Sequence, residues 1–158
     1  MHKTGFSLIE LMIVVAIMGF LAMLAVPNFM RFLSKAKRAE AYMNLSSIYA
    51  AEKAYFAEHG TYSSVLTGQG GIGWKPEGYN GGGKNAKNYY TYGFAGADGT
   101  HYFSGKLEGG NTGLSRSKAD GTGFVAVACG DIDGDGVPDI ITVDENNNIT
   151  IVQDDLAD

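Results

Sequence analysis

An uninterrupted apolar segment near the N-terminus constrains this chain more than any other feature. Between Lys3 and Arg31 the sequence carries one formal charge, that of Glu10. A run of this length is enough to cross a bilayer as a helix, which takes about 20 apolar residues. A carboxylate inside such a run costs on the order of 2.5–3.5 kcal/mol, so an acid placed there usually has a function. We therefore expect Glu10 to meet an opposite charge, which indicates assembly rather than simple anchoring.

The same segment is not typical of a cleaved secretory signal. A short basic start is followed at once by the apolar run from Phe6, but no A-x-A site comes after it, because Ala22 and Ala25 have the wrong spacing. The helical pattern also continues through Pro27 into residues that look like part of a fold. Neither a cleaved signal nor a plain anchor explains Glu10.

The stretch Gly5-Phe6-Ser7-Leu8-Ile9-Glu10, followed by LMIVVAIMGFLAMLAVPNF, closely resembles the N-terminus of type IV prepilins and pseudopilins. A weaker similarity runs through EKAYFAEHGTYSS, residues 52–64. The resemblance implies that prepilin peptidase, an aspartyl protease of the inner membrane, cleaves between Gly5 and Phe6 and removes the leader, residues 1–5. It also implies that the new amino group of Phe6 is methylated.

The resemblance further implies which residues act in assembly. Glu10 would face the Phe6 amino group of a neighbouring subunit, and Gly19 and Pro27 would bound a stretch of helix that can lose hydrogen bonds in the filament. Physical reasoning agrees, because an amine and a carboxylate attract strongly in a medium of low dielectric constant, whereas either one alone is costly to bury. A subunit in the wrong register would leave both unpaired, so the pair would fix the axial register.

The hydrophobic pattern predicts one long helix, from about Phe6 to His59, ended by Gly60. Such a helix would be about 80 Å long. Its first half, residues 6–30, is apolar all round, as in a membrane span or the core of a filament. Its second half, residues 31–60, is amphipathic, and its apolar face is predicted to dock on a domain through Ala41, Leu45, Ile48, Ala51 and Tyr55.

The rest of the chain predicts a glycine-rich loop and then a small sheet. Residues 61–88 are expected to form a long irregular loop that Trp74 and Tyr79 pin to the domain. Residues 89–158 are expected to form an antiparallel sheet, with strands at 89–95, 101–109, 123–130, 139–145 and 149–154, the first two as a hairpin. The predicted fold class is α+β, with the long N-terminal helix packed on this sheet in two layers.

The acidic loop at 130–139, GDIDGDGVPD, approximates the first nine positions of a calcium loop. The candidate ligands are the carboxylates of Asp131, Asp133, Asp135 and Asp139 and the backbone carbonyl of Val137, all of them oxygens that suit Ca²⁺. The pattern departs from an EF-hand at Thr142, where a glutamate would stand, and no helices flank the loop. The alternative is an acidic turn in solvent. A bound ion would brace the C-terminal hairpin of a chain whose single cysteine, Cys129, permits no intrachain disulfide.

No pattern predicts catalysis. The three histidines show no catalytic or metal-triad spacing, and motifs for a phosphate-binding loop and for haem attachment are missing. We therefore expect no enzyme, and no cofactor other than calcium. A basic cluster just after the apolar run is expected to pair with neighbouring subunits or with phospholipid headgroups; it comprises Arg31, Lys35, Lys37 and Arg38.

Together these features predict a structural subunit of a type IV pilus-like filament, a helical homopolymer serving adhesion, motility, DNA uptake or electron export. The family implies an assembly ATPase, an inner-membrane platform protein and a secretin as partners. It also implies residence in the inner membrane before assembly and on the surface of a Gram-negative-type bacterium afterwards. Two alternatives stay open: the major pseudopilin of a type II secretion system, which forms a periplasmic pseudopilus, and a membrane-anchored calcium-binding domain.

Overall fold

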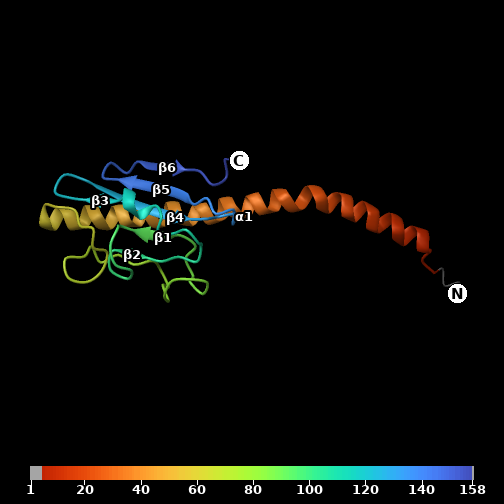
Figure 1. Cartoon of the computed structure of the whole chain (residues 1–158), viewed down its shortest axis with the longest axis horizontal. Coiled ribbons are helices and arrows are strands. Elements are labelled where there is room, and N and C mark those ends of the chain that lie inside the picture. Colours follow the sequence, from red (N-terminus) through yellow and green to blue (C-terminus); the bar gives the residue numbers. More distant parts are fainter. Residues whose placement is uncertain (1–4, 158) are drawn as a thin grey trace. The chain divides into compact units, whose positions relative to one another are not determined.

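The structure, a computed structural model, describes residues 5–157 and is dominated by one long helix, α1, Leu8–His59 (Figure 1). The predicted helix is confirmed to within two residues at its start. It ends where predicted, because Gly60 adopts a left-handed conformation with φ of 69°. Residues 1–4, which make up most of the predicted leader, lie outside the described residues.

The chain divides into two compact units, Met1–Lys35 and Ala36–Asp158. The sequence pattern instead placed the change from the apolar to the amphipathic half of the helix between residues 30 and 31. In the first unit, every large apolar side chain from residue 6 to residue 33 is at least 37% exposed. This part of α1 is long and apolar enough to cross a membrane.

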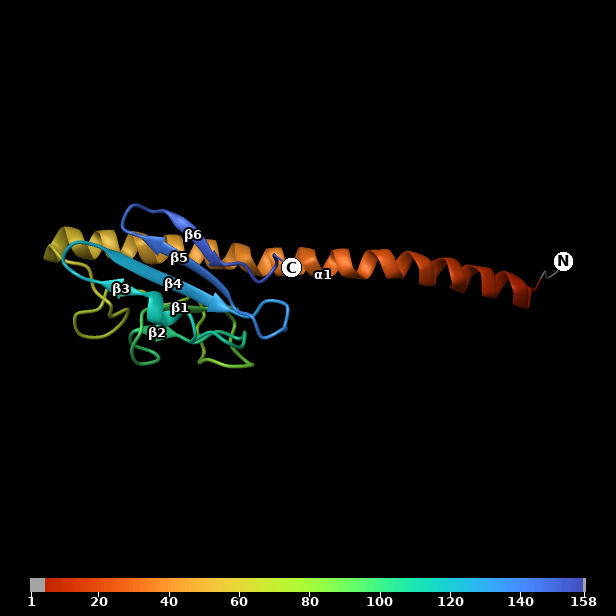
Figure 2. The ribbon, with the colours of Figure 1, turned by 45° about the horizontal axis from the view of Figure 1, so that its top comes forward.

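The second unit is an antiparallel sheet that lies along its own part of α1, residues 36–59 (Figures 1 and 2). The strand order is β2-β1-β4-β5-β6, and β3 pairs with the start of β4. A 3₁₀ helix, Leu114–Arg116, precedes β3. The strands are β1 Thr91–Gly93, β2 Tyr102–Phe103, β3 Lys118–Ala119, β4 Phe124–Gly130, β5 Asp139–Asp144 and β6 Ile149–Gln153.

The predicted hairpin of residues 89–95 and 101–109 is confirmed, but its strands are much shorter than expected. Gly93 has φ of 134°, and a Cβ there would lie 2.3 Å from the carbonyl oxygen of His101, so the strands approach too closely for a side chain. The hairpin strand ends after Phe103, and the Gly105 N–H donates to the Thr91 hydroxyl at 3.0 Å. Strand β3 was not predicted, because two residues carry no local pattern and only pairing with β4 defines them.

The core lies between α1 and the sheet. The predicted helix residues Ala41, Leu45 and Ile48 are fully buried in it. Ala51 is partly buried against the same core, whereas Tyr55 lies outside it and stacks on His59, with ring centroids 4.1 Å apart. Tyr55 was therefore wrongly assigned to the docking face, since its half-buried side chain is not part of the core.

Residues 61–88 contain no helix or strand and are held to the domain by aromatic side chains, as predicted. The Trp74 indole N–H donates to the Ser47 hydroxyl at 2.6 Å, which ties the loop to α1. The ring of Tyr79 packs edge-on against Phe103, with centroids 4.8 Å apart. Both contacts join the loop to the rest of the second unit, at an exposed position of α1 and at the buried Phe103.

A carboxyl group is buried beneath the start of this loop. Glu52 of α1 is fully buried, and its Oε2 accepts a hydrogen bond from the Ser63 N–H at 3.2 Å. Its Oε1 finds no partner among the described residues. Burial raises the pKa of Glu52 to about 7, against the smaller lowering effect of the Ser63 hydrogen bond.

Replacing Glu52 with glutamine should stabilise the domain most at high pH. A folded-state pKa of about 7, above the usual value, means that ionisation of Glu52 weakens the fold as the pH rises from about 4.5 towards 8. Glutamine stays neutral and still accepts from the Ser63 N–H, so Glu52→Gln should gain on the order of 2 kcal/mol at pH 8 and little at pH 4.5. Urea unfolding of the full chain in detergent measures this difference.

Glu58→Gln is the matched control, because Glu58 is an exposed carboxylate of the same helix. It should leave the pH dependence of unfolding unchanged. An equal gain for Glu52→Gln at both pH values would show that Glu52 is not neutral in the folded protein.

Candidate functional site

The predicted assembly residues at the start of α1 form a capping box. Ser7 directly precedes the helix, and its hydroxyl accepts a hydrogen bond from the Glu10 N–H at 3.2 Å. The Ser7 N–H in turn makes a long contact of 3.5 Å to Glu10 Oε2. The pattern Ser-x-x-Glu before an apolar run is the sequence signal for this box, which was not among the predicted features. The Glu10 carboxylate thus contacts the N–H of Ser7. This N–H belongs to the peptide group that directly follows the predicted cleavage point, which lies between Gly5 and Phe6.

The other predicted assembly residues lie within or beside the exposed apolar part of α1. Phe6 is 73% exposed. A Cβ on Gly19 would meet nothing within 4 Å, so packing within this chain does not require glycine there. Pro27 lies inside the helix and lacks the N–H that would bond the Met23 carbonyl. The assembly roles of these residues stay predictions.

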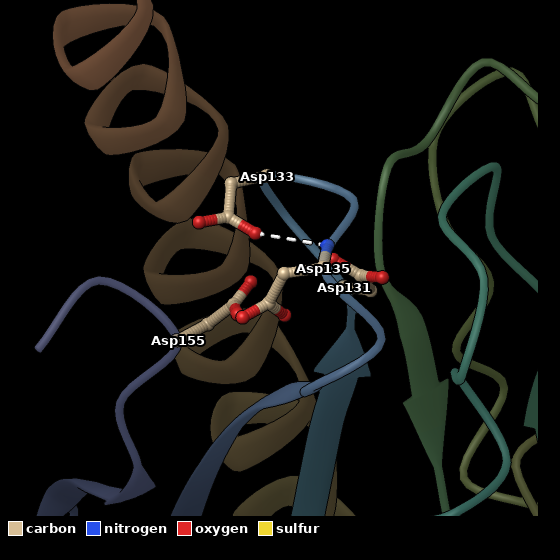
Figure 3. A group of neighbouring side chains, drawn as sticks. All are labelled: Asp131, Asp133, Asp135 and Asp155. Atoms are coloured by element: carbon tan, nitrogen blue, oxygen red, sulfur yellow. Dashed lines mark hydrogen bonds between the residues drawn. The ribbon is translucent and has the colours of Figure 1, made fainter. Parts of the chain in front are cut away.

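The acidic loop folds around its own aspartates. Asp131 accepts the N–H groups of Gly134 and Gly136, at 2.6 and 2.9 Å, and both glycines have φ near +90°. Asp133 accepts from the Asp135 N–H at 3.2 Å, the dashed contact in Figure 3. The Asp135 carboxylate accepts from the Val137 N–H at 2.7 Å. These bonds turn the three carboxylates of the loop towards one region.

The C-terminal segment supplies the fourth carboxylate of this cluster. Asp155 comes from the turn after β6 and points at Asp135, as Figure 3 shows. One ligand oxygen from each of four residues lies within 4.8 Å of the others; the four are Asp131, Asp133, Asp135 and Asp155. The prediction that Asp139 completes the set is therefore wrong. No spacing rule could have found Asp155, since it lies sixteen residues beyond Asp139, the last residue of the acidic loop.

Asp155 has a buried carboxylate oxygen without a hydrogen-bond partner in the part of the chain that the structure describes. It is 3% exposed, its Oδ2 accepts from the Ile132 N–H at 2.6 Å, and its Oδ1 has no partner among residues 5–157. Burial, with the charges of Asp133 and Asp131, raises the pKa of Asp155 to about 6. A buried carboxylate oxygen without a donor is costly unless a proton or a metal ion meets it. The donor set, all oxygens, fits Ca²⁺.

Asp139 instead belongs to a buried ion pair. Arg38 of α1 donates to both of its oxygens, from Nε at 3.0 Å and from Nη2 at 2.7 Å, and the Tyr90 hydroxyl donates to Oδ2 at 2.7 Å. Arg38 Nη2 also contacts Asp154 Oδ1 at 2.5 Å. Burial lowers the pKa of Arg38, but Asp154 and Asp139 outweigh that effect and hold it above its ordinary value. We call the four residues Arg38, Tyr90, Asp139 and Asp154 the arginine hub.

In the basic cluster after the apolar run, two of the four residues bind groups of the same chain. Arg38 is engaged in the hub, and Lys37 Nζ donates to the Ile132 carbonyl at 2.6 Å. The expectation that these two residues face neighbouring subunits or lipid headgroups was wrong, because carboxylates and a carbonyl of the same chain engage them. For Val137, whose side chain is 42% exposed, the role of its carbonyl as a ligand stays a prediction.

Comparison with known proteins relates the chain to filament subunits. Residues 1–26 match a family model described as "Prokaryotic N-terminal methylation motif". The chain is 48% identical over 76 residues to the type IV major pilin protein PilA of Myxococcus xanthus. It is 38% identical over 75 residues to the type II secretion system core protein G of Pectobacterium carotovorum. It is also 38% identical over 68 residues to the type IV major pilin protein PilE1 of Neisseria gonorrhoeae.

These alignments cover 48%, 48% and 43% of this chain, in that order. They cover 33%, 48% and 41% of the relatives. The chain therefore spans less than half the length of the relatives it matches.

Arg38→Met should destabilise the domain by about 3–5 kcal/mol, because it leaves the fully buried Asp139 without its counter-charge. Adding Asp139→Asn to this variant should restore part of the loss, since no fully buried charge is then left unpaired; Asp154 is partly exposed. Urea unfolding of the full chain in detergent gives both values. Lys35→Met, at an exposed position of α1, serves as the control. A loss below about 1 kcal/mol for Arg38→Met, typical of a surface pair, would contradict the buried hub.

Proposed function

We propose that the chain is a structural subunit of a type IV pilus-like extracellular filament, which its similarity to type IV pilins supports. The observation that carries this proposal is Glu10, a carboxylate inside an apolar helix surface that no other part of residues 5–157 covers. Lipid can cover the apolar side chains, but the hydrocarbon core of a bilayer offers the carboxylate no opposite charge. Other copies of the same helix would offer both an apolar surface for the side chains and an opposite charge for the carboxylate.

Assembly would satisfy the apolar surface and the carboxylate together. Packing the first units of many copies side by side buries apolar area at about 25 cal/mol per Å², which offsets removal from the bilayer. Cleavage after Gly5 would create a positive amine on Phe6, and this amine is a stronger partner for Glu10 than the Ser7 N–H at 3.5 Å. Because a shifted copy would leave both charges buried and unpaired, the pair would select one axial register.

The same proposal assigns the partners and the route. Prepilin peptidase would remove residues 1–5 and methylate Phe6, which agrees with the methylation motif matched by residues 1–26. An assembly ATPase and a platform protein would then draw the subunit from the inner membrane into the filament, which would leave the cell through a secretin. In this role the chain is a building block and not an enzyme.

A periplasmic pseudopilus is the second candidate for the filament, favoured by the similarity to a type II secretion core protein. Shearing of wild-type cells separates the two functions. Surface fibres that contain this chain support a pilus, whereas bare cells that lose protein secretion when the gene is deleted support a pseudopilus.

Glu10→Ala should abolish fibres and leave the chain in the membrane, because the variant keeps its apolar helix but loses the charge that pairs with Phe6. Electron microscopy of the sheared fraction and immunoblots of membranes measure the two outcomes. Glu58→Ala, an exposed carboxylate elsewhere on α1, should assemble normally. Normal fibres from the Glu10 variant would refute the charge pair, whereas a wild-type chain that forms no fibres would favour the membrane-anchored binding domain.

We also propose that the second unit binds one calcium ion through Asp131, Asp133, Asp135 and Asp155. The unpartnered, buried Oδ1 of Asp155 supports this, because an ordinary acidic turn in solvent would leave no carboxylate oxygen buried. The ion would neutralise carboxylates that otherwise repel one another. It would also tie the loop after β4 to the segment after β6.

Calcium should raise the thermal midpoint of the full chain relative to a chelator, by a stabilisation of about 2.7 kcal/mol at a hundredfold excess over Kd. Magnesium should do less, because it demands a tighter octahedral shell and gives up its waters reluctantly. Asp155→Asn should weaken calcium binding by about tenfold or more in titration calorimetry, or about 1.4 kcal/mol. Glu77→Gln, at an exposed carboxylate, is the control. An unchanged midpoint in calcium would refute this site.

A further inference from the structure

The cation cluster is joined to α1 through the residue between its first two ligands. Ile132 is 2% exposed, and its backbone N–H and carbonyl are both hydrogen-bonded. Its N–H donates to Asp155 Oδ2 at 2.6 Å, and its carbonyl accepts from Lys37 Nζ at 2.6 Å. A short path therefore runs from a cluster ligand, through the backbone of one residue, to the helix.

A second path runs through the arginine hub. The Asp155 N–H makes a long contact of 3.4 Å to Asp139 Oδ1, and the preceding residue, Asp154, contacts Arg38. Asp139 and Asp154 together hold Arg38, the neighbour of Lys37 on α1. The backbone of residues 154–155 thus carries one ligand of the cluster and one member of the hub. Any movement of Asp155 away from the loop also moves the carboxylate that holds the helix.

The charge balance of this region makes both paths sensitive to a cation. Six aspartates lie in the cluster and the hub, whereas the basic groups that bind there are Lys37 and Arg38. Four of the carboxylates crowd within 4.8 Å, and like charges at that separation repel strongly where water is partly excluded. A divalent ion removes the repulsion that pushes Asp155 off the loop.

We infer that occupation of the cluster by a divalent cation fastens the loop after β4 and the C-terminal segment onto α1 at Lys37 and Arg38. This inference rests on the proposed calcium site. The ion then does more than brace its own loop, since it sets how firmly the helix is held at the start of the second unit. By linkage, the contact with the helix must strengthen cation binding by the same factor as the cation strengthens the contact.

Lys37→Met tests this coupling, because simple electrostatics and coupling predict opposite results. Removal of a positive charge close to the cluster should, by charge alone, tighten calcium binding. Loss of the bond to Ile132 should, by coupling, weaken it by about fivefold or more, the lower range of measured couplings. Titration of the full chain in detergent with calcium chloride measures the affinity. Lys35→Met removes a charge two residues away, at an exposed position without the bond to Ile132, and is the matched control.

Hydrogen exchange of the same samples gives a second readout. Calcium should slow exchange in residues 130–136 and 154–157 and also in residues 36–41 of α1. In Lys37→Met the protection of residues 36–41 by calcium should fall by about fivefold or more, while the loop still responds.

The outcomes separate the two proposals. Weaker calcium binding by Lys37→Met, with Lys35→Met unchanged or tighter, supports the coupling. Equal or tighter binding by Lys37→Met, or calcium protection confined to the loop, overturns the coupling and leaves the calcium site in place. A wild-type chain that binds no calcium refutes the site and the coupling together.

Discussion

The buried pair of Arg38 and Asp139 is the interaction on which the second unit depends. Asp139 is fully buried at the start of β5, and without Arg38 its charge would lack a partner of opposite sign. Tyr90, just before β1, donates its hydroxyl to Asp139. Asp154, just after β6, contacts Arg38. One guanidinium group therefore joins the helix to the middle strands and to the end of the chain. The geometry fits arginine rather than lysine, because the planar fork donates to both oxygens of one carboxylate.

The parts of the fold set by local pattern could be predicted from the sequence, and those set by distant partners could not. Apolar periodicity and Gly60 gave the extent of α1, and the aromatic residues of the glycine-rich segment were recognised as its anchors. Strand β3 and the use of Asp155 depend on contacts across the sheet or across many residues, for which a single sequence holds no signal. The acidic loop shows both cases, since its spacing identified three carboxylates and then assigned the wrong fourth one.

The two units meet different physical demands. The first unit exposes its apolar surface and holds its one carboxylate in a local capping box, so it is complete only in contact with lipid or with other chains. The second unit buries its own core and collects negative charge at one end of the sheet. In the proposed filament, hydrophobic association and a single ion pair would drive assembly, while the domain would be free to vary its surface.

The single cysteine gives this architecture a chemical consequence. Cys129 lies buried in β4 and hydrogen-bonds the Gly109 carbonyl at 3.3 Å, so it takes no part in holding the end of the chain. Closure of the C-terminal segment rests on aspartates, an arginine and backbone amides instead. Folding of the second unit therefore requires no thiol-oxidising enzyme. With the proposed calcium site, its stability would depend on the free calcium concentration rather than on the redox state.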